Sequence, residues 1–126
     1  MARKSIYVDA FGHTMPIPAA ARVGNIVMSG IIYGLDPETG KAATTLERQC
    51  ELMFVHLRAI VEASGASLDD IVKLNVQMVD RSQRKPLNDE WLKMFPEPDN
   101  RPARQAMECA LGEGILVQCD FIAVIA

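Results

Sequence analysis

The last twelve residues, ILVQCDFIAVIA (residues 115–126), carry the pattern that decides the fold. Alternate positions along this stretch separate into two sets, and both sets are largely apolar. The first set contains Val117, Cys119, Phe121, Ala123 and Ile125, and the second contains Leu116, Gln118, Asp120, Ile122 and Val124. An antiparallel sheet with helices on one side normally leaves its other face to water. We therefore expect a strand that is covered on both faces, with helices on one side and a second copy of the chain on the other.

Working outward from this strand, the sequence predicts the order ββαβαββ, an α+β fold in which a mixed sheet carries two helices on one face. Residues 5–10 and 26–34 are typical of strands, and residues 71–80 alternate cleanly between apolar and polar. Thr44 and Glu47 form a capping-box pair that would open the first helix, and Gly65 would end it. The second helix is expected from Pro86 onward. If the strands at 104–111 and 115–126 pair with each other, Gln118 and Asp120 could lie on the strand next to Arg104.

Length and composition limit the class of protein. A chain of 126 residues predicts a single domain over residues 1–126. The net charge is −3, whereas binding to a nucleic acid requires a basic surface. No run of residues is long and apolar enough for a signal peptide or a membrane span. Cys50, Cys109 and Cys119 form no CxxC pair, so we expect buried thiols rather than zinc ligands or a disulfide framework. The expected location is the cytoplasm.

Arg104 raises the main question about function, because it alternates with apolar neighbours at the start of a predicted strand. Guanidinium groups are rarely buried without a partner. Three partners are open: a carboxylate of the same chain (Asp120 or Glu108), a neighbouring subunit, or an anionic ligand gripped by two parallel hydrogen bonds. His56 is predicted to lie at the surface or in an interface. His13 lies in a loop and could line a pocket.

Four segments together resemble the Rid (YjgF-like) family of reactive intermediate deaminases, also labelled endoribonuclease L-PSP-like. They are RVGNIVMSGIIYGLDPETGK, LRAIVEASGASLDDIVKLNVQMVD, LNDEWLKMFPE and RPARQAMEC. The resemblance extends from about Pro16 to the C-terminus, in matching order and spacing. It implies a chorismate-mutase-like fold and a homotrimer around a central barrel, with three ligand clefts between subunits. It also implies hydrolysis of small enamines and imines to 2-keto acids and ammonia, without a metal or cofactor.

The resemblance also assigns residues to the site. Arg104 matches the arginine that holds the substrate's carboxylate, Gly30 a glycine whose backbone lines the cleft, and Asn88 an asparagine beside it. Ala106 replaces the family's cysteine, and Gln118 replaces the glutamate that orients or activates water. Glutamine can hydrogen-bond a water but cannot take its proton.

Ile17 and Pro18 replace a tyrosine and a serine of the family's cleft. Tyr33, His13 or Asp120 could contribute in their place. A more apolar cleft predicts a substrate whose side chain is larger or less polar than that of 2-aminoacrylate.

We therefore expect Arg104 to bind a small 2-imino, 2-enamino or 2-keto acid, and Gln118 to position water for hydrolysis. The alternative is a trimer that keeps the carboxylate site but has lost or changed the reaction, and acts as a sensor or accessory protein. A ribonuclease is the least supported reading, because the chain is acidic and no stacking aromatic residues accompany a basic groove.

Overall fold

The computed structural model describes residues 2–12 and 15–126. Its elements, in chain order, are β1 (Lys4–Ile6), η1 (Asp9–Phe11), β2 (Ala20–Val23), β3 (Ile26–Ser29), β4 (Ile32–Tyr33), β5 (Leu35–Asp36), β6 (Lys41–Ala42), α1 (Leu46–Ala63), η2 (Leu68–Asp70), β7 (Ile71–Met78), α2 (Lys85–Met94), β8 (Ala103–Glu108) and β9 (Val117–Val124). Here η marks a short 3₁₀ helix. The order from α1 onward is the predicted one, while the segment before α1 contains more and shorter strands than expected.

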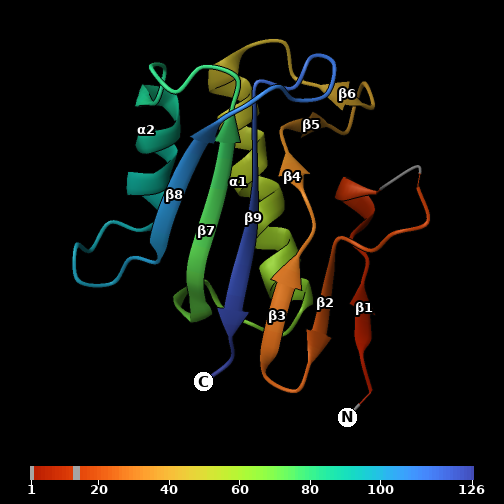
Figure 1. Ribbon diagram of the computed structural model, residues 1–126. Helices are drawn as coiled ribbons and strands as arrows, with labels where there is room; N and C mark the ends of the chain where they lie inside the picture. Colours follow the sequence, from red (N-terminus) through yellow and green to blue (C-terminus); the bar gives the residue numbers. More distant parts are fainter. Residues whose placement is uncertain (1, 13–14) are drawn as a thin grey trace.

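Among the described residues, seven strands form the main sheet, in the order β1-β2-β3-β9-β7-β8 with β4 also paired to β9. The strands β7 and β8 are parallel and the other pairs are antiparallel, so the sheet is mixed. The two helices α1 and α2 lie on one side of this sheet, behind it in Figure 1. This arrangement confirms the predicted α+β fold with both helices on one face.

The last two strands, β8 and β9, do not pair with each other. The strand β7 lies between β8 and β9 and pairs with both of them. The reason is that β7, α2 and β8 form a βαβ unit, in which the helix carries the chain back so that β8 can run parallel to β7. The strand β8 is consequently at the edge of the sheet, and Arg104 is not a neighbour of Gln118 or Asp120.

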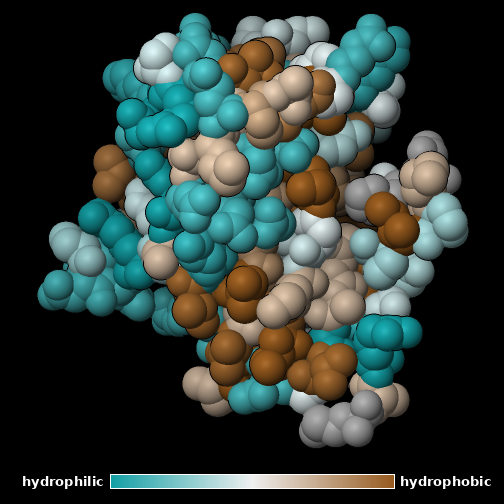
Figure 2. All heavy atoms as spheres, viewed as in Figure 1, coloured by the Kyte–Doolittle hydropathy of each residue, from teal (hydrophilic) through white to brown (hydrophobic). Residues whose placement is uncertain are grey.

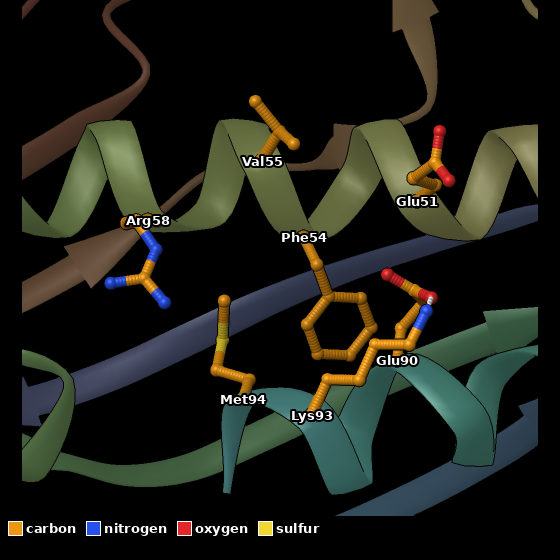
Figure 3. Close-up of a pocket in the computed structure, with 7 residues that line it drawn as sticks. All are labelled: Glu51, Phe54, Val55, Arg58, Glu90, Lys93 and Met94. Carbon is orange, nitrogen blue, oxygen red and sulfur yellow. Dashed lines mark hydrogen bonds and ion pairs between the residues drawn. The ribbon is translucent and has the colours of Figure 1, made fainter.

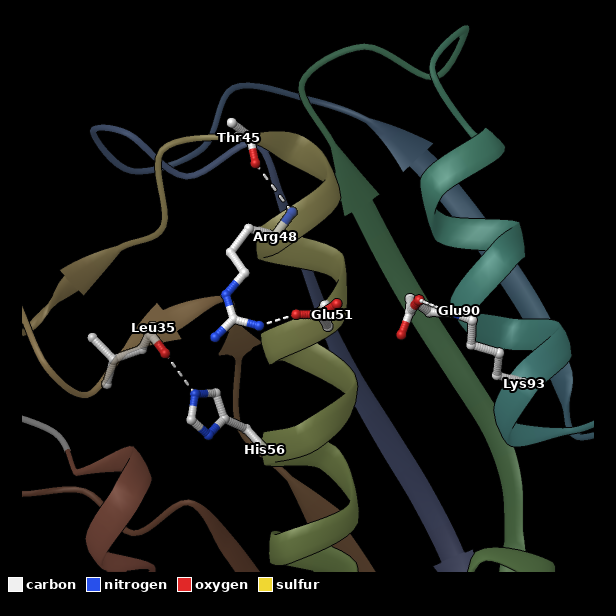
Figure 4. Close-up of polar contacts among 7 residues, drawn as sticks. All are labelled: Leu35, Thr45, Arg48, Glu51, His56, Glu90 and Lys93. Carbon is white, nitrogen blue, oxygen red and sulfur yellow. Dashed lines mark hydrogen bonds and ion pairs between the residues drawn. The ribbon is translucent and has the colours of Figure 1, made fainter.

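Helix α1 follows the predicted apolar pattern, but it begins one residue later than the capping box indicated. Thr45, not Thr44, is the N-cap, and its side-chain oxygen accepts a hydrogen bond from the backbone N–H of Arg48 at 3.2 Å (Figure 4). The helix ends before Gly65, whose φ of 88° is a left-handed conformation that glycine adopts without steric cost. The predicted end of the helix is therefore confirmed.

His56 is buried within its own chain, which corrects the prediction that it lies at the surface or in an interface. His56 is 1% exposed, and its Nε2 lies 2.7 Å from the carbonyl oxygen of Leu35 (Figure 4). The centre of its ring lies 4.9 Å from that of the Phe11 ring. The flank of α1 that the sequence pattern assigned to water is covered by β5 and η1. Cys109 corrects a second expectation, because it is exposed while Cys50 and Cys119 are buried.

Two predicted strands are shorter than expected. The first ends at Ile6, and residues 9–11 form the 3₁₀ helix η1. The strand expected over residues 26–34 is divided into β3 and β4 at Gly30 and Ile31. At this break the Gly30 backbone N–H donates to the Ala19 carbonyl at 2.9 Å.

The two faces of β9 have different surroundings, as the sequence pattern indicated. Val117, Cys119, Phe121 and Ala123 are fully buried beneath the helices. The opposite face of the sheet, called the open face below, faces the viewer in Figure 2. Its lower half is apolar, with exposed side chains at Val23, Ile26, Met28 and Val124 and the half-buried Ile122. Its upper half is polar and contains Asn75, Gln77, Gln118 and Asp120.

Candidate functional site

Arg104 lies on the edge strand β8 and points toward helix α2. Its register partner on β7 is the buried Leu74, so both side chains are on the helix-covered face of the sheet. Arg104 Nη2 donates to Asn88 Oδ1 at 2.8 Å, and the guanidinium carbon lies 4.9 Å from the centre of the Trp91 ring. These contacts hold the guanidinium plane against α2. The structure thus brings together Arg104 and Asn88, two of the predicted site residues.

The second terminal nitrogen of Arg104, Nη1, is buried and has no hydrogen-bond partner. Neither carboxylate proposed as an intramolecular partner is available to it. Asp120 accepts a hydrogen bond from Asn75 at 2.9 Å, and Glu108 accepts one from the Arg81 backbone at 2.9 Å. Burial, followed by repulsion from Arg84, lowers the pKa of Arg104. Arg104 therefore forms no ion pair within residues 2–12 and 15–126, and its geometry is suited to an external anion.

Gln118, Asp120 and Tyr33 lie together on the open face, opposite to Arg104. Tyr33 is the register partner of Gln118, and Asn75 is that of Asp120. The Gln118 side chain makes a long contact of 3.4 Å with Gln77. Because sheet faces alternate along each strand, a single chain does not bring Arg104 and Gln118 to the same small molecule.

The fold of the single chain does not require a glycine at position 30. Its φ is not positive, and a Cβ atom placed on it would have its nearest neighbour, the Ala19 carbonyl oxygen, at 3.8 Å. Gly34 is the opposite case, since a Cβ there would lie 2.4 Å from the Cα of Gln49. Gly34 therefore permits α1 to approach the sheet, whereas a glycine at position 30 leaves room on the outer side of the chain.

The remaining predicted site residues are dispersed. Ala106 is on the same face of β8 as Arg104 and packs against the core. Ile17 is 49% exposed in the segment before β2, and Pro18 is half-buried. His13 lies outside the described residues. One chain therefore does not assemble Ile17, Pro18, Ala106 and Gln118 into a common apolar cleft.

Gln49 is a structurally important residue that the sequence interpretation missed. It is fully buried; its amide nitrogen donates to the carbonyls of Ala43 (2.7 Å) and Gly114 (2.8 Å), and its Oε1 accepts from the Leu116 backbone (2.9 Å). It thereby fixes the segment that leads into β9 and Gln118. The signal was present, because Gln49 lies within the apolar stripe of α1, next to Cys50 and one turn before Met53.

Two hollows on the described part of the chain are lined by residues other than Arg104. A groove of about 230 Å³ lies between α1 and α2, with Phe54 and Met94 between the helices and an ion pair of Glu90 and Lys93 at one side (Figure 3). A larger hollow of about 470 Å³ is bordered by Tyr33, Lys41 and Ile115. Within the described residues, no group of three acidic, histidine or cysteine side chains could hold a metal ion, and no helix is long and apolar enough to cross a membrane.

Comparison with known proteins gives consistent results. The family model described as Endoribonuclease L-PSP matches residues 9–125. A RutC family protein of Pyrococcus abyssi is 30% identical over 98% of both chains. A protein of Dermatophagoides farinae named 2-iminobutanoate/2-iminopropanoate deaminase is 33% identical over 87% of this chain and 86% of its own. The crystal structure of RidA from an Antarctic Psychrobacter superposes with a TM-score of 0.88 at 35% identity, covering 97% of this chain and 99% of the other.

Proposed function

Because the chain belongs to the endoribonuclease L-PSP family, to which the RutC and RidA proteins are related, we propose that it hydrolyses small 2-imino or 2-enamino acids whose carboxylate binds Arg104. The observation that carries the proposal is the Arg104 guanidinium. One of its nitrogens is fixed by Asn88, and the other is buried without a partner. Arginine binds a carboxylate through two parallel hydrogen bonds, so Arg104 would fix the orientation of the substrate.

The reaction is the addition of water to the C2 carbon of the protonated imine. The C–N bond then breaks, ammonia leaves and a 2-keto acid remains, so an enamine must first take a proton on carbon to become the imine. Gln118 would orient the water through its amide, and the positive charge on the imine makes C2 reactive without a strong base. Holding the two reactants in place is itself a large source of acceleration.

The active site is proposed to form between copies of the chain. Arg104 and Gln118 lie on opposite faces of one sheet, so a substrate that contacts both needs them from two different chains. The apolar lower half of the open face supports association, because four of its side chains are 40–52% exposed in the single chain. We infer a homotrimer, in which Gly30 of one copy would approach Arg104 of the next.

A second candidate function is binding without turnover, favoured by the amide of Gln118. An amide cannot remove a proton from water at neutral pH. A chain that retains Arg104 but lacks this base could hold a 2-keto acid as a sensor.

The test is hydrolysis of imines generated in place by an amino-acid oxidase, followed through the loss of semicarbazone formation. Arg104→Ala is expected to lower kcat/KM by roughly a hundredfold or more, because the carboxylate loses its charged partner. Arg58→Ala is the matched control, an exposed arginine on α1 whose removal should leave the rate unchanged. Absence of turnover, with keto acids still raising the melting temperature only when Arg104 is present, would select the binding function.

Mixing two inactive variants tests the shared site. Arg104→Ala and Gln118→Ala chains, unfolded together and refolded at equal amounts, should regain roughly a quarter of the active sites if each site in a cyclic trimer takes the two residues from neighbouring chains. No recovery in mixed assemblies would contradict the shared site.

A further inference from the structure

A second arginine, Arg84, lies one helical turn before Asn88 on helix α2. The backbone N–H of Asn88 donates to the Arg84 carbonyl at 2.9 Å, which places the two residues on the same side of the helix. Asn88 is the residue that holds Arg104. After burial, repulsion from Arg84 is the second cause of the lowered pKa of Arg104, as expected for two positive charges that act on each other.

Arg84 forms no ion pair with any residue in the described part of the chain. The acidic side chains near it are engaged elsewhere: Asp89 pairs with Lys85, Glu90 pairs with Lys93, and Glu108 accepts from the Arg81 backbone. Two like charges beside each other are unfavourable unless an anion compensates them. The pair of Arg84 and Arg104 therefore carries more positive charge than a single carboxylate would neutralise.

The residue that follows Arg104 on the same face of β8 has a small side chain. Ala106 follows Arg104 on this face, about 7 Å further along the strand, and its side chain is a single methyl group. Because β8 and α2 run in opposite directions, the step from Arg104 to Ala106 leads toward the beginning of α2, where Arg84 lies (Figure 1). Ala106 itself packs against the core, so a ligand that extends from Arg104 toward Arg84 would pass a small apolar side chain at this point.

We propose that Arg84 is a specificity-determining residue of the Arg104 site, and that the preferred substrate is a 2-imino acid whose side chain ends in a second carboxylate, as formed by oxidation of an acidic amino acid. This inference rests on the proposed function and names its substrate class. It retains the expectation of a side chain larger than that of 2-aminoacrylate. It departs from the alternative of a less polar side chain, because the positive charge of Arg84 favours a negatively charged one.

The test compares the imines of glutamate and norleucine, which are similar in length but differ in the second charge. The wild-type protein is expected to have the higher kcat/KM for the glutamate imine. Arg84→Gln should lower that value roughly tenfold and leave the value for norleucine imine unchanged, because one charge-assisted hydrogen bond is lost. Arg58→Gln removes the same charge from the other helix and should change neither value.

The binding of the corresponding keto acids, 2-oxoglutarate and 2-oxohexanoate, separates this inference from the proposed function. If no imine is hydrolysed, the proposed function fails, and tighter binding of 2-oxoglutarate that depends on Arg84 would still support the second anion site. A preference for norleucine imine or 2-oxohexanoate in the wild type would overturn the inference. So would an Arg84→Gln variant that loses both substrates equally.

Discussion

Replacement of Gln49 by leucine tests how the segment that leads into β9 is held. The substitution keeps the side chain about the same size but removes three hydrogen bonds, two donated to the carbonyls of Ala43 and Gly114 and one accepted from the Leu116 backbone. These three backbone groups would then lack their partner, and an unsatisfied buried polar group costs about 1–3 kcal/mol. Two of the three bonds are partly accessible to water, which replaces some of the loss.

The expected loss is therefore about 3–5 kcal/mol of the free energy of unfolding. In a chain of this size that corresponds to a melting temperature lower by roughly 10–20 °C. The assay is urea denaturation followed by the fluorescence of Trp91, the one tryptophan of the sequence and a buried one. All variants are compared at one protein concentration, because unfolding of an oligomer depends on concentration.

Gln83→Leu is the matched control, since it makes the same chemical change on an exposed side chain. Its effect should stay within about 0.5 kcal/mol. A Gln49→Leu variant that loses less than about 1 kcal/mol would refute the reasoning, because it would mean that water or neighbouring groups satisfy all three backbone partners.

Three further predictions concern two glycines, the accessibility of the thiols and the dependence of stability on alkaline pH. Gly34→Ala should lower the free energy of unfolding by about 3 kcal/mol, because the new methyl group meets the backbone of α1. Gly30→Ala should leave urea denaturation nearly unchanged but lower imine turnover. Equal stability of the two variants would contradict the packing argument. At pH 8 a thiol reagent should label Cys109 alone, because the other two thiols are buried. Burial, with a smaller effect of Glu90 and Glu47, raises the pKa of Cys50 from 9.0 to about 12. The folded state therefore favours the protonated thiol of Cys50. The contribution of Cys50 to the free energy of unfolding is complete below pH 9 and is lost as the pH rises toward 12. A Cys50→Ala variant whose stability declines at alkaline pH as much as that of the wild type would contradict this prediction.

The sequence predicted features that depend on alternation within one element. The two faces of β9, the apolar stripe of α1 and the stop at Gly65 were all read correctly, because each depends on residues a few positions apart. The N-cap was misplaced by one residue because Thr44 and Thr45 are both suitable caps, and only the path of the chain selects between them.

Features that depend on which elements become neighbours could not be predicted from alternation within one element. His56 was assigned to the surface or an interface because it lies off the main apolar stripe of α1, yet β5 and η1 cover it. The sequence left open whether the last two strands pair, and β7 lies between them. The parallel pairing of β7 and β8 could have been inferred, since the ten-residue helix between them supplies the crossover that parallel strands need.

The interpretation of Arg104 depends both on alternation within its strand and on the order of the strands in the sheet. Its alternation with apolar residues predicted a position facing the core, but left its partner open among a carboxylate, a subunit and a ligand. The strand order removes the carboxylates, because Asp120 faces the other side of the sheet and Glu108 is bound to the Arg81 backbone. A guanidinium withdrawn from water without a counter-charge is destabilising. A chain that used position 104 only for packing would be more stable with an apolar residue there, so the arginine is best explained by an anion that arrives from outside the chain.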